Sequence, residues 1–142
     1  MKTKYQTFDL IDLISERHIS LRSFCEKAWN SSSNIPISNS EWFIMARIYK
    51  NQPTISYVSK HVDISRQATH KFIKNLEAKG LVKILNVENN NKDKCLQLTA
   101  LGEECYEKNE AFKASLIQKI TDQIGEDNIK KLHDILKMDW GL

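Results

Sequence analysis

The segment from Ser65 to Leu81, SRQATHKFIKNLEAKGL, constrains the fold of this chain more than any other stretch. Its apolar residues recur at the spacing of one helix face, at Ala68, Phe72, Ile73 and Leu76. Ser65 is suited to cap the start of this helix, and Gly80 is suited to end it. The opposite face carries Arg66, Gln67, His70, Lys71 and Lys74, whereas Thr69 lies at the edge of the apolar face. The sequence therefore predicts an amphipathic helix whose exposed face is cationic and rich in hydrogen-bonding groups.

The elements on both sides of this helix complete a known supersecondary unit. Thr54 is suited to cap a short preceding helix, and Asp63-Ile64 supplies the turn between the two helices. Two strand-like runs follow, at 81–85 and 95–99, with a polar turn at 89–92. A helix-turn-helix followed directly by a hairpin is a winged helix, and its second helix has the size to enter the major groove of DNA.

The rest of the chain is also mainly helical. Its apolar periodicity predicts further helices over residues 5–30, 41–50, 100–124 and 126–138. Ser40 and Thr99 are suited to cap the second and third of these. The expected fold class is mainly α with a small β-hairpin wing, in which a winged helix-turn-helix is flanked by N- and C-terminal helices.

Length and composition narrow the classes of protein. A chain of 142 residues suggests one domain, 1–142, large enough to bury a core without disulfides or metals. No apolar run is long enough to span a bilayer and the N-terminus lacks a signal-peptide pattern, so a cytoplasmic protein without a membrane partner is expected. The three cysteines and four histidines show no disulfide or metal-ligand spacing. No cofactor-binding or catalytic motif is present, so an enzyme is not expected.

Basic charge is concentrated in the middle of the chain. Residues 60–94 hold eight basic and four acidic side chains, whereas residues 95–142 hold six basic and nine acidic ones. A local positive field suits a polyanion such as double-stranded DNA. On an exposed helix face, glutamine matches adenine, arginine matches guanine, and lysine suits phosphate. The candidate contacts to the major groove are Ser65, Arg66, Gln67, Thr69, His70, Lys71 and Lys74.

Two stretches carry a resemblance to a known family. They are TISYVSKHVDISRQATHKFIKNLEAKGLV and, after the hairpin, LTALG. From Glu41 to Gly102 the chain resembles the MarR family of winged helix-turn-helix bacterial transcription regulators. The resemblance implies a homodimer on a near-palindromic operator, with a winged-helix lobe at about 41–99 and dimerisation helices at about 1–30 and 100–142. It also implies a repressor that responds to a ligand or to redox state.

The resemblance extends to the tip of the wing. In the family, the tip places an arginine in the minor groove, and an aspartate two residues earlier braces it. The aligned residues here are Asn90, Asn91 and Lys92. Lys92 stands in for the arginine as a point charge without a planar fork, and Asn90 cannot form the bracing salt bridge. A more flexible wing with weaker minor-groove readout is expected.

The resemblance also implies where a signal could act. Family members bind small aromatic compounds in a cleft beside the DNA-binding lobe, and the candidate lining residues here are Trp29, Trp42, Phe43 and Tyr106. The competing interpretation is that these four are ordinary core residues. Some branches sense peroxides through a cysteine in the first helix, which makes Cys25 a candidate redox site. A small buried apolar side chain is the alternative role for Cys25.

Two other functions remain open on the sequence alone. A winged helix can serve as a protein–protein interaction module without specific DNA binding, but such a module should expose apolar residues on its second helix. Here that helix exposes charged and amide side chains. An enzyme that uses the winged helix only as a dimerisation arm would need a separate catalytic domain, and a chain of 142 residues leaves little room for one.

Overall fold

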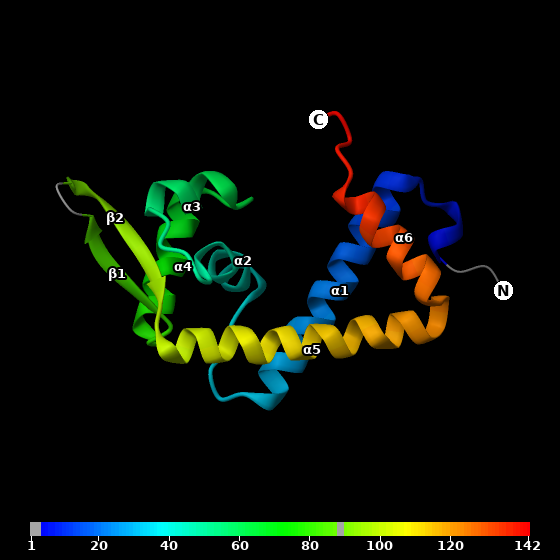
Figure 1. Ribbon diagram of the computed structural model, residues 1–142, viewed down its shortest axis with the longest axis horizontal. Coiled ribbons are helices and arrows are strands. Elements are labelled where there is room, and N and C mark those ends of the chain that lie inside the picture. Colours follow the sequence, from blue (N-terminus) through cyan, green and yellow to red (C-terminus); the bar gives the residue numbers. More distant parts are fainter. Residues whose placement is uncertain (1–3, 88–89) are drawn as a thin grey trace. The chain divides into compact units, whose positions relative to one another are not determined.

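The computed structural model describes residues 4–87 and 90–142, with the side chains of residues 5–86 and 93–142 (Figure 1). The chain divides into two compact units, Met1–Asn109 and Glu110–Leu142. The first unit contains the helix-turn-helix and the hairpin. The second contains the end of one helix and the whole of the last.

The first unit follows the predicted order of elements. After a short 3-10 helix at Lys4–Thr7 come α1 (Leu10–Ser32), α2 (Asn39–Ile48), α3 (Ile55–His61), α4 (Arg66–Ala78), β1 (Val82–Val87), β2 (Asn90–Leu98) and the first part of α5 (Ala100–Ile124). The rest of α5 and α6 (Glu126–Lys137) form the second unit. This order confirms the predicted mainly helical fold with a β-hairpin wing.

Three helices begin where the sequence places their caps. The hydroxyls of Thr54, Ser65 and Thr99 each accept a hydrogen bond from the backbone N–H three residues later, at 3.0, 3.1 and 3.0 Å. Each bond satisfies a donor that the first turn of a helix leaves without a partner. Local side-chain chemistry therefore fixes the starts of α3, α4 and α5.

The predicted cap of α2 at Ser40 is wrong, because Ser38 occupies that position. Ser38 and Glu41 form a capping box. The Ser38 hydroxyl accepts a hydrogen bond from the N–H of Glu41 at 3.3 Å, and the Glu41 carboxylate accepts one from the N–H of Ser38 at 3.0 Å. This arrangement needs the acidic residue three positions after the cap, a spacing that Ser40 does not have to Glu41.

The hairpin is longer than predicted. The polar turn expected at 89–92 is wrong in extent, because β2 already begins at Asn90. The strands of a hairpin pair through backbone N–H and C=O groups, so polar residues can belong to such a ladder. The antiparallel register pairs Val82 with Leu98 and Ile84 with Leu96. At the inner end, the N–H of Leu96 also donates to the carbonyl of Pro53 at 2.8 Å, which attaches the wing to the segment before α3.

The core of the first unit is formed by side chains of α1, α2, α3, α4 and the hairpin. Its almost fully buried side chains include Trp29, Ile44, Met45, Ile48, Val58, Ile73, Leu76, Leu81 and Leu96. Ile73 and Leu76 belong to the predicted apolar stripe of α4, so the inward face of that helix is confirmed at these positions. With this face buried, the cationic face of α4 turns to solvent.

Apolar side chains are exposed on the helices outside this core. On α1 they include Leu10, Ile11 and Ile19, and in the second unit they include Ile117, Leu132, Ile135, Leu136 and Met138. Within α6, which the structure describes in full, no residue is buried. Contiguous exposed apolar surface is typical of protein interaction sites. None of the described helices is long and apolar enough to cross a membrane.

Candidate nucleic-acid interface

The exposed face of α4 is the core of the candidate interface. Five side chains of this face and of the first turn of the helix are exposed to solvent: Arg66, Gln67, His70, Lys71 and Lys74. Lys74 makes a loose contact with Glu77, with 3.7 Å between Nζ and Oε1, and its side chain is 72% exposed. Such a surface pair contributes little to stability. The lysine is therefore free to exchange this carboxylate for another anion.

Thr69 belongs to the inward side of α4, at whose edge the helical spacing places it, and not to the exposed face where it was expected to contact DNA. Its side chain is fully buried, and its hydroxyl donates a hydrogen bond to the carbonyl of Ser65 at 2.9 Å. A threonine in a helix commonly bonds back to the carbonyl four residues earlier. The side chain is thus withdrawn from solvent and cannot reach a partner outside the protein. Ser65 is exposed, but its hydroxyl already serves as the cap of α4.

A groove of about 610 Å³ lies beside α4, between α3, α4 and the hairpin. Its lining combines the α4 residues Arg66, His70, Ile73 and Lys74 with Ile55, Ser56, Ser59 and Lys60 from α3 and Ile84, Asp93 and Lys94 from the hairpin. Four lysine and arginine side chains thus converge on a groove whose lining contains one carboxylate. Within the described residues, the buried hydroxyl oxygen of Ser59 has no hydrogen-bond partner.

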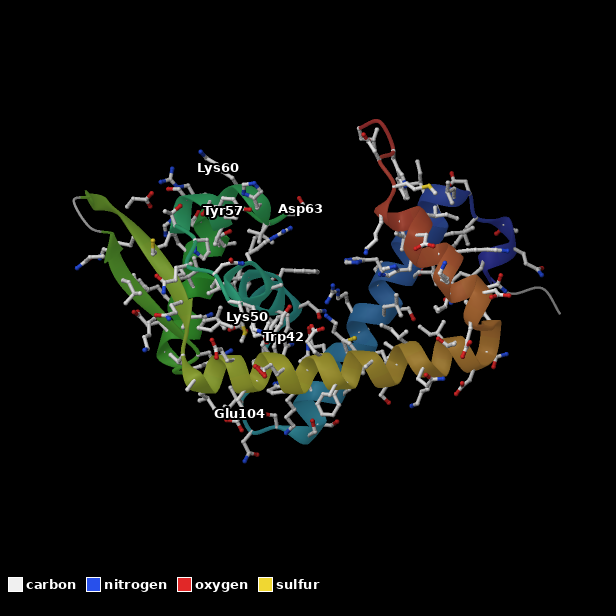
Figure 2. All side chains as sticks on the ribbon, viewed as in Figure 1. Trp42, Lys50, Tyr57, Lys60, Asp63 and Glu104 are labelled. Carbon is white, nitrogen blue, oxygen red and sulfur yellow. The ribbon has the colours of Figure 1, made fainter. Side chains whose placement is uncertain are left out.

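Lys60 and Lys94 are residues of the groove lining that the sequence did not single out as candidate contacts. Both belong to the basic middle of the chain, but their separation in sequence from α4 hid their common place. Lys60, labelled in Figure 2, lies in the last turn of α3, and Lys94 pairs through its backbone with Asn86 in the hairpin. Only the packing of α3 and β1 against α4, and of β2 against α3, brings these two cations to the groove beside α4.

Solved structures of other proteins share this arrangement across nearly the whole chain. The structure of NadR in complex with 4-hydroxyphenylacetate matches with a TM-score of 0.71 and 24% identity, over 98% of this chain and 100% of that one. The apo form of wild-type MarR from E. coli matches with a TM-score of 0.79 and 19% identity, over 93% and 97%. Streptococcus pneumoniae FabT in complex with DNA matches with a TM-score of 0.74 and 22% identity, over 89% and 90%.

The chain has the fold of the MarR-family regulators. The predicted winged helix-turn-helix with its flanking helices is therefore confirmed as a MarR fold. No protein-family model matches the chain, and no curated protein matches it. The likeness is thus one of structure, at low sequence identity.

The wing tip of this MarR fold is described only in its backbone. Asn90, Asn91 and Lys92 belong to β2, and their side chains lie outside the described part of the chain. The register of the hairpin shifts between Asn86 and Val87. A bulge of this kind bends and twists a ribbon. The minor-groove contact of Lys92 stays a prediction.

The aromatic residues proposed to line a ligand cleft pack against other rings. Trp29 and Trp42 meet edge to face, with ring centroids 5.1 Å apart. Trp29 donates its indole N–H to the carbonyl of Ile35 at 2.7 Å, whereas the buried indole N–H of Trp42 has no hydrogen-bond partner among the described residues. A buried donor without a partner costs about 1–3 kcal/mol. Trp42, labelled in Figure 2, therefore keeps a buried N–H donor without a hydrogen-bond partner among the described residues.

The other two aromatic residues lie in different surroundings. Phe43 stacks on His18, and the guanidinium carbon of Arg22 lies 4.5 Å from its ring centroid. Tyr106 stacks on Tyr49 with centroids 4.3 Å apart. Neighbouring residues of a helix point about 100° apart, so Trp42 and Phe43 face different sides of α2. The four residues are thus divided among several packing sites.

The three cysteines are free thiols in different degrees of burial. Cys25 and Cys105 are buried, and Cys95 is partly exposed on β2. Burial raises the pKa of the Cys105 thiol, and the charge of Glu104 adds to this effect while Lys108 opposes it. A thiol with a raised pKa holds little reactive thiolate. Cys25, the candidate redox site, is 8% exposed.

Proposed function

We propose that this protein is a sequence-specific, double-stranded DNA-binding transcription regulator that acts as a homodimer. The observation that supports this proposal best is the convergence of Arg66, Lys74, Lys60 and Lys94 on one groove beside the exposed face of α4. Cationic grooves concentrate polyanions and release counterions on binding. FabT, which has the same fold, has been solved in complex with DNA.

The exposed residues of α4 divide by chemistry into two sets. Gln67 and Arg66 lie in the first turn of the helix, where a recognition helix reaches base edges, and their amide and guanidinium groups suit adenine and guanine. Lys71 and Lys74, with Lys60 and Lys94 of the groove, suit phosphates. His70 lies between the sets as a further contact, and Lys92 extends the contact to the minor groove.

The homodimer is proposed from the exposed apolar faces of the flanking helices. A single chain leaves Leu10, Ile11 and Ile19 of α1 and Leu132, Ile135 and Leu136 of α6 exposed. A second copy of the chain would cover them and present a second α4. Two copies of α4 related by a two-fold axis read two half-sites of a near-palindrome, about one helical turn apart.

The proposed response is to a small aromatic ligand, with repression in its absence. NadR, of the same fold, has been solved with 4-hydroxyphenylacetate. The unpartnered indole N–H of Trp42 offers a buried donor to such a compound. A ligand that binds better to one arrangement of the two recognition helices shifts the dimer away from the arrangement that DNA needs. Oxidation of Cys25 is the less favoured trigger, because oxidation follows the exposure of the thiol.

The rival function, a protein–protein interaction module without specific DNA binding, lacks support from α4. Such a module should present an apolar patch there, and the exposed residues of α4 are polar or charged except Ala78 in its last turn.

Selection from a pool of randomised duplex DNA, at two salt concentrations, tests the proposal. We expect enrichment of a near-palindrome and an affinity that falls steeply with salt. Lys74→Ala should weaken binding, whereas Lys130→Ala on α6, which removes another exposed lysine, should not. Failure of the ligand-free protein to enrich any sequence would overturn the specific regulator and favour the protein-contact module.

A further inference from the structure

Lys79, at the end of α4, is joined to the start of α2. Its ammonium nitrogen donates to both carboxylate oxygens of Glu41, at 2.9 and 2.7 Å, and to the carbonyl oxygen of Pro36 at 2.6 Å. The Glu41 side chain is only 5% exposed, and that of Lys79 is 25% exposed. A partly buried charged pair with an additional hydrogen bond resists exchange with water far more than a surface pair does.

Glu41 has a second function that fixes its place. The same carboxylate accepts hydrogen bonds from the backbone N–H and the hydroxyl of Ser38, both at 3.0 Å. The carboxylate that closes the capping box of α2 is therefore the one that receives Lys79. Because α2 belongs to the core, its first turn is a rigid anchor for the end of α4.

The segment that carries the other acceptor, Pro36, is held by α1. Trp29 donates to the carbonyl of Ile35 at 2.7 Å. Asn30 accepts from the N–H of Ile37 at 3.3 Å, and Glu26 accepts from the N–H of Asn39 at 3.1 Å. Three side chains from the last part of α1 thus fix the residues around Pro36. Lys79 is bonded to a segment whose position α1 determines.

Lys79 lies at the end of α4 that is remote from the candidate DNA contacts. It is the C-cap of the helix, and the chain reverses at Gly80 with φ +77°. The 13 residues of α4 make a rod about 20 Å long, with Arg66 and Gln67 at its other end. A small rotation of α4 about Lys79 therefore displaces the first turn of the helix, where bases would be read, by several ångströms.

We propose that Lys79 is a positioning residue that sets the orientation of α4 relative to α1 without touching DNA. This inference rests on the proposed function, in which α1 contributes to the dimer and α4 reads a half-site. If both roles hold, the bonds of Lys79 to Glu41 and Pro36 fix the separation and angle of the two recognition helices. The residue then determines which spacing between half-sites the dimer accepts.

Three variants separate this role from simpler ones. Lys79→Met keeps the aliphatic stem and removes the charge, Lys79→Arg keeps the charge and several donors, and Glu41→Gln keeps the capping box but removes the carboxylate charge. Each is tested against the selected operator and against operators whose spacer is one base pair longer or shorter. We expect the unmodified protein to prefer one spacing by about tenfold or more. Tenfold corresponds to a difference in binding free energy of about 1.4 kcal/mol.

Lys79→Met and Glu41→Gln should each reduce that preference to about threefold or less. Lys79→Arg should keep the preference of the unmodified protein. The salt dependence of binding should stay unchanged, because Lys79 neutralises no phosphate. An unchanged spacing preference in Lys79→Met would overturn the inference. So would an equal loss of affinity for all duplexes with a salt slope lower by about one, since that result marks a direct phosphate contact.

A measurement without DNA distinguishes failure of this inference from failure of the proposed function. Spin labels at the exposed positions 27 on α1 and 75 on α4, in a variant without native cysteines and diluted with unlabelled protein, report the distance between these helices. The distribution should broaden or shift in Lys79→Met and recover in Lys79→Arg. An unchanged distribution contradicts the inference, whatever the protein binds. Should Lys79→Met fail to fold, Lys79→Met with Glu41→Gln removes both charges of the pair and gives the same comparison.

Discussion

The carbonyl group of Leu81 occupies the space that a side chain at Gly102 would need. A β-carbon built on Gly102 would overlap the Leu81 carbonyl oxygen and lie 3.1 Å from its carbon. The same oxygen accepts a hydrogen bond from the N–H of Thr99 at 3.0 Å, so it cannot easily move away. The glycine of the LTALG stretch therefore permits the close approach of α5 to the start of the hairpin.

Gly102→Ala should destabilise the protein by about 1–3 kcal/mol, because overpacking of a fixed backbone costs this much. In an open helix the same change would stabilise by up to about 1 kcal/mol, since alanine favours helix formation. The sign of the change in the free energy of unfolding, from urea denaturation, decides between the two. Glu104→Ala, at an exposed neighbouring position of α5, is the matched control and should have a small effect. A more stable Gly102→Ala variant would show that the contact is not tight in solution.

How far the sequence predicts this structure depends on how local each interaction is. The caps at Thr54, Ser65 and Thr99 are decided within one turn of helix, so the sequence predicts them. The error at Ser40 arose because several serines precede α2, and only the spacing to Glu41 selects Ser38. The position of Lys79 beside Glu41 joins residues 38 apart in the chain, and no local pattern indicates it.

The candidate interface shows the same division. Helical periodicity predicts the exposed side of α4 and the inward place of Thr69. The prediction of Thr69 as a DNA contact is wrong, because a hydroxyl that bonds to a backbone carbonyl can be buried as readily as an apolar group. Lys60 and Lys94 could be counted as basic residues, but their convergence on α4 depends on tertiary packing. The dispersal of Trp29, Trp42, Phe43 and Tyr106 likewise depends on which side of each helix faces the core.

Lys60→Ala should weaken binding to all duplex sequences by a similar factor. A lysine that contacts a phosphate contributes about 0.9 to the slope of log affinity against log salt, so the slope should fall by about that amount. Fluorescence anisotropy with labelled operator, over a range of salt, measures both quantities. Lys130→Ala removes a lysine whose side chain is 81% exposed on α6 and should leave the slope as it is. Equal slopes for Lys60→Ala and the unmodified protein would remove Lys60 from the interface.

Gln67→Ala should act on sequence preference more than on overall affinity. The amide of an exposed glutamine in the first turn of a recognition helix can bond adenine at two points, which discriminates against other bases by about 1–3 kcal/mol. Selection from randomised DNA should therefore show one base position per half-site relaxed, with binding to non-specific DNA unchanged. If Gln67→Ala enriches the same operator with the same stringency, Gln67 reads no base.

Under the proposed regulation by a small aromatic acid, Trp42→Phe should weaken the response to that ligand. Trp42 is 3% exposed, and its indole N–H has no hydrogen-bond partner among the described residues. A hydrogen bond from this donor to a charged ligand is worth about 1.5–3 kcal/mol, so its loss should raise the concentration of 4-hydroxyphenylacetate that releases operator DNA by about tenfold or more. Trp140→Phe, at a half-exposed position near the C-terminus, is the control. Equal release from both variants would place the ligand away from Trp42.

The stability of the protein should decrease as the pH rises through the alkaline range, partly because of Cys105. Burial raises the pKa of this thiol above its ordinary value. Above the ordinary pKa of about 8.5, the thiol ionises in the unfolded chain and stays protonated in the folded one. The unfolded state then binds fewer protons, so the free energy of unfolding falls as the pH rises. Well below pH 8.5 both states are protonated, and this contribution is absent.

Urea denaturation between pH 7 and 10 should show a shallower decline of the free energy of unfolding in Cys105→Ala than in the unmodified protein. Parallel declines in the two proteins would show that the Cys105 thiol ionises equally in both states.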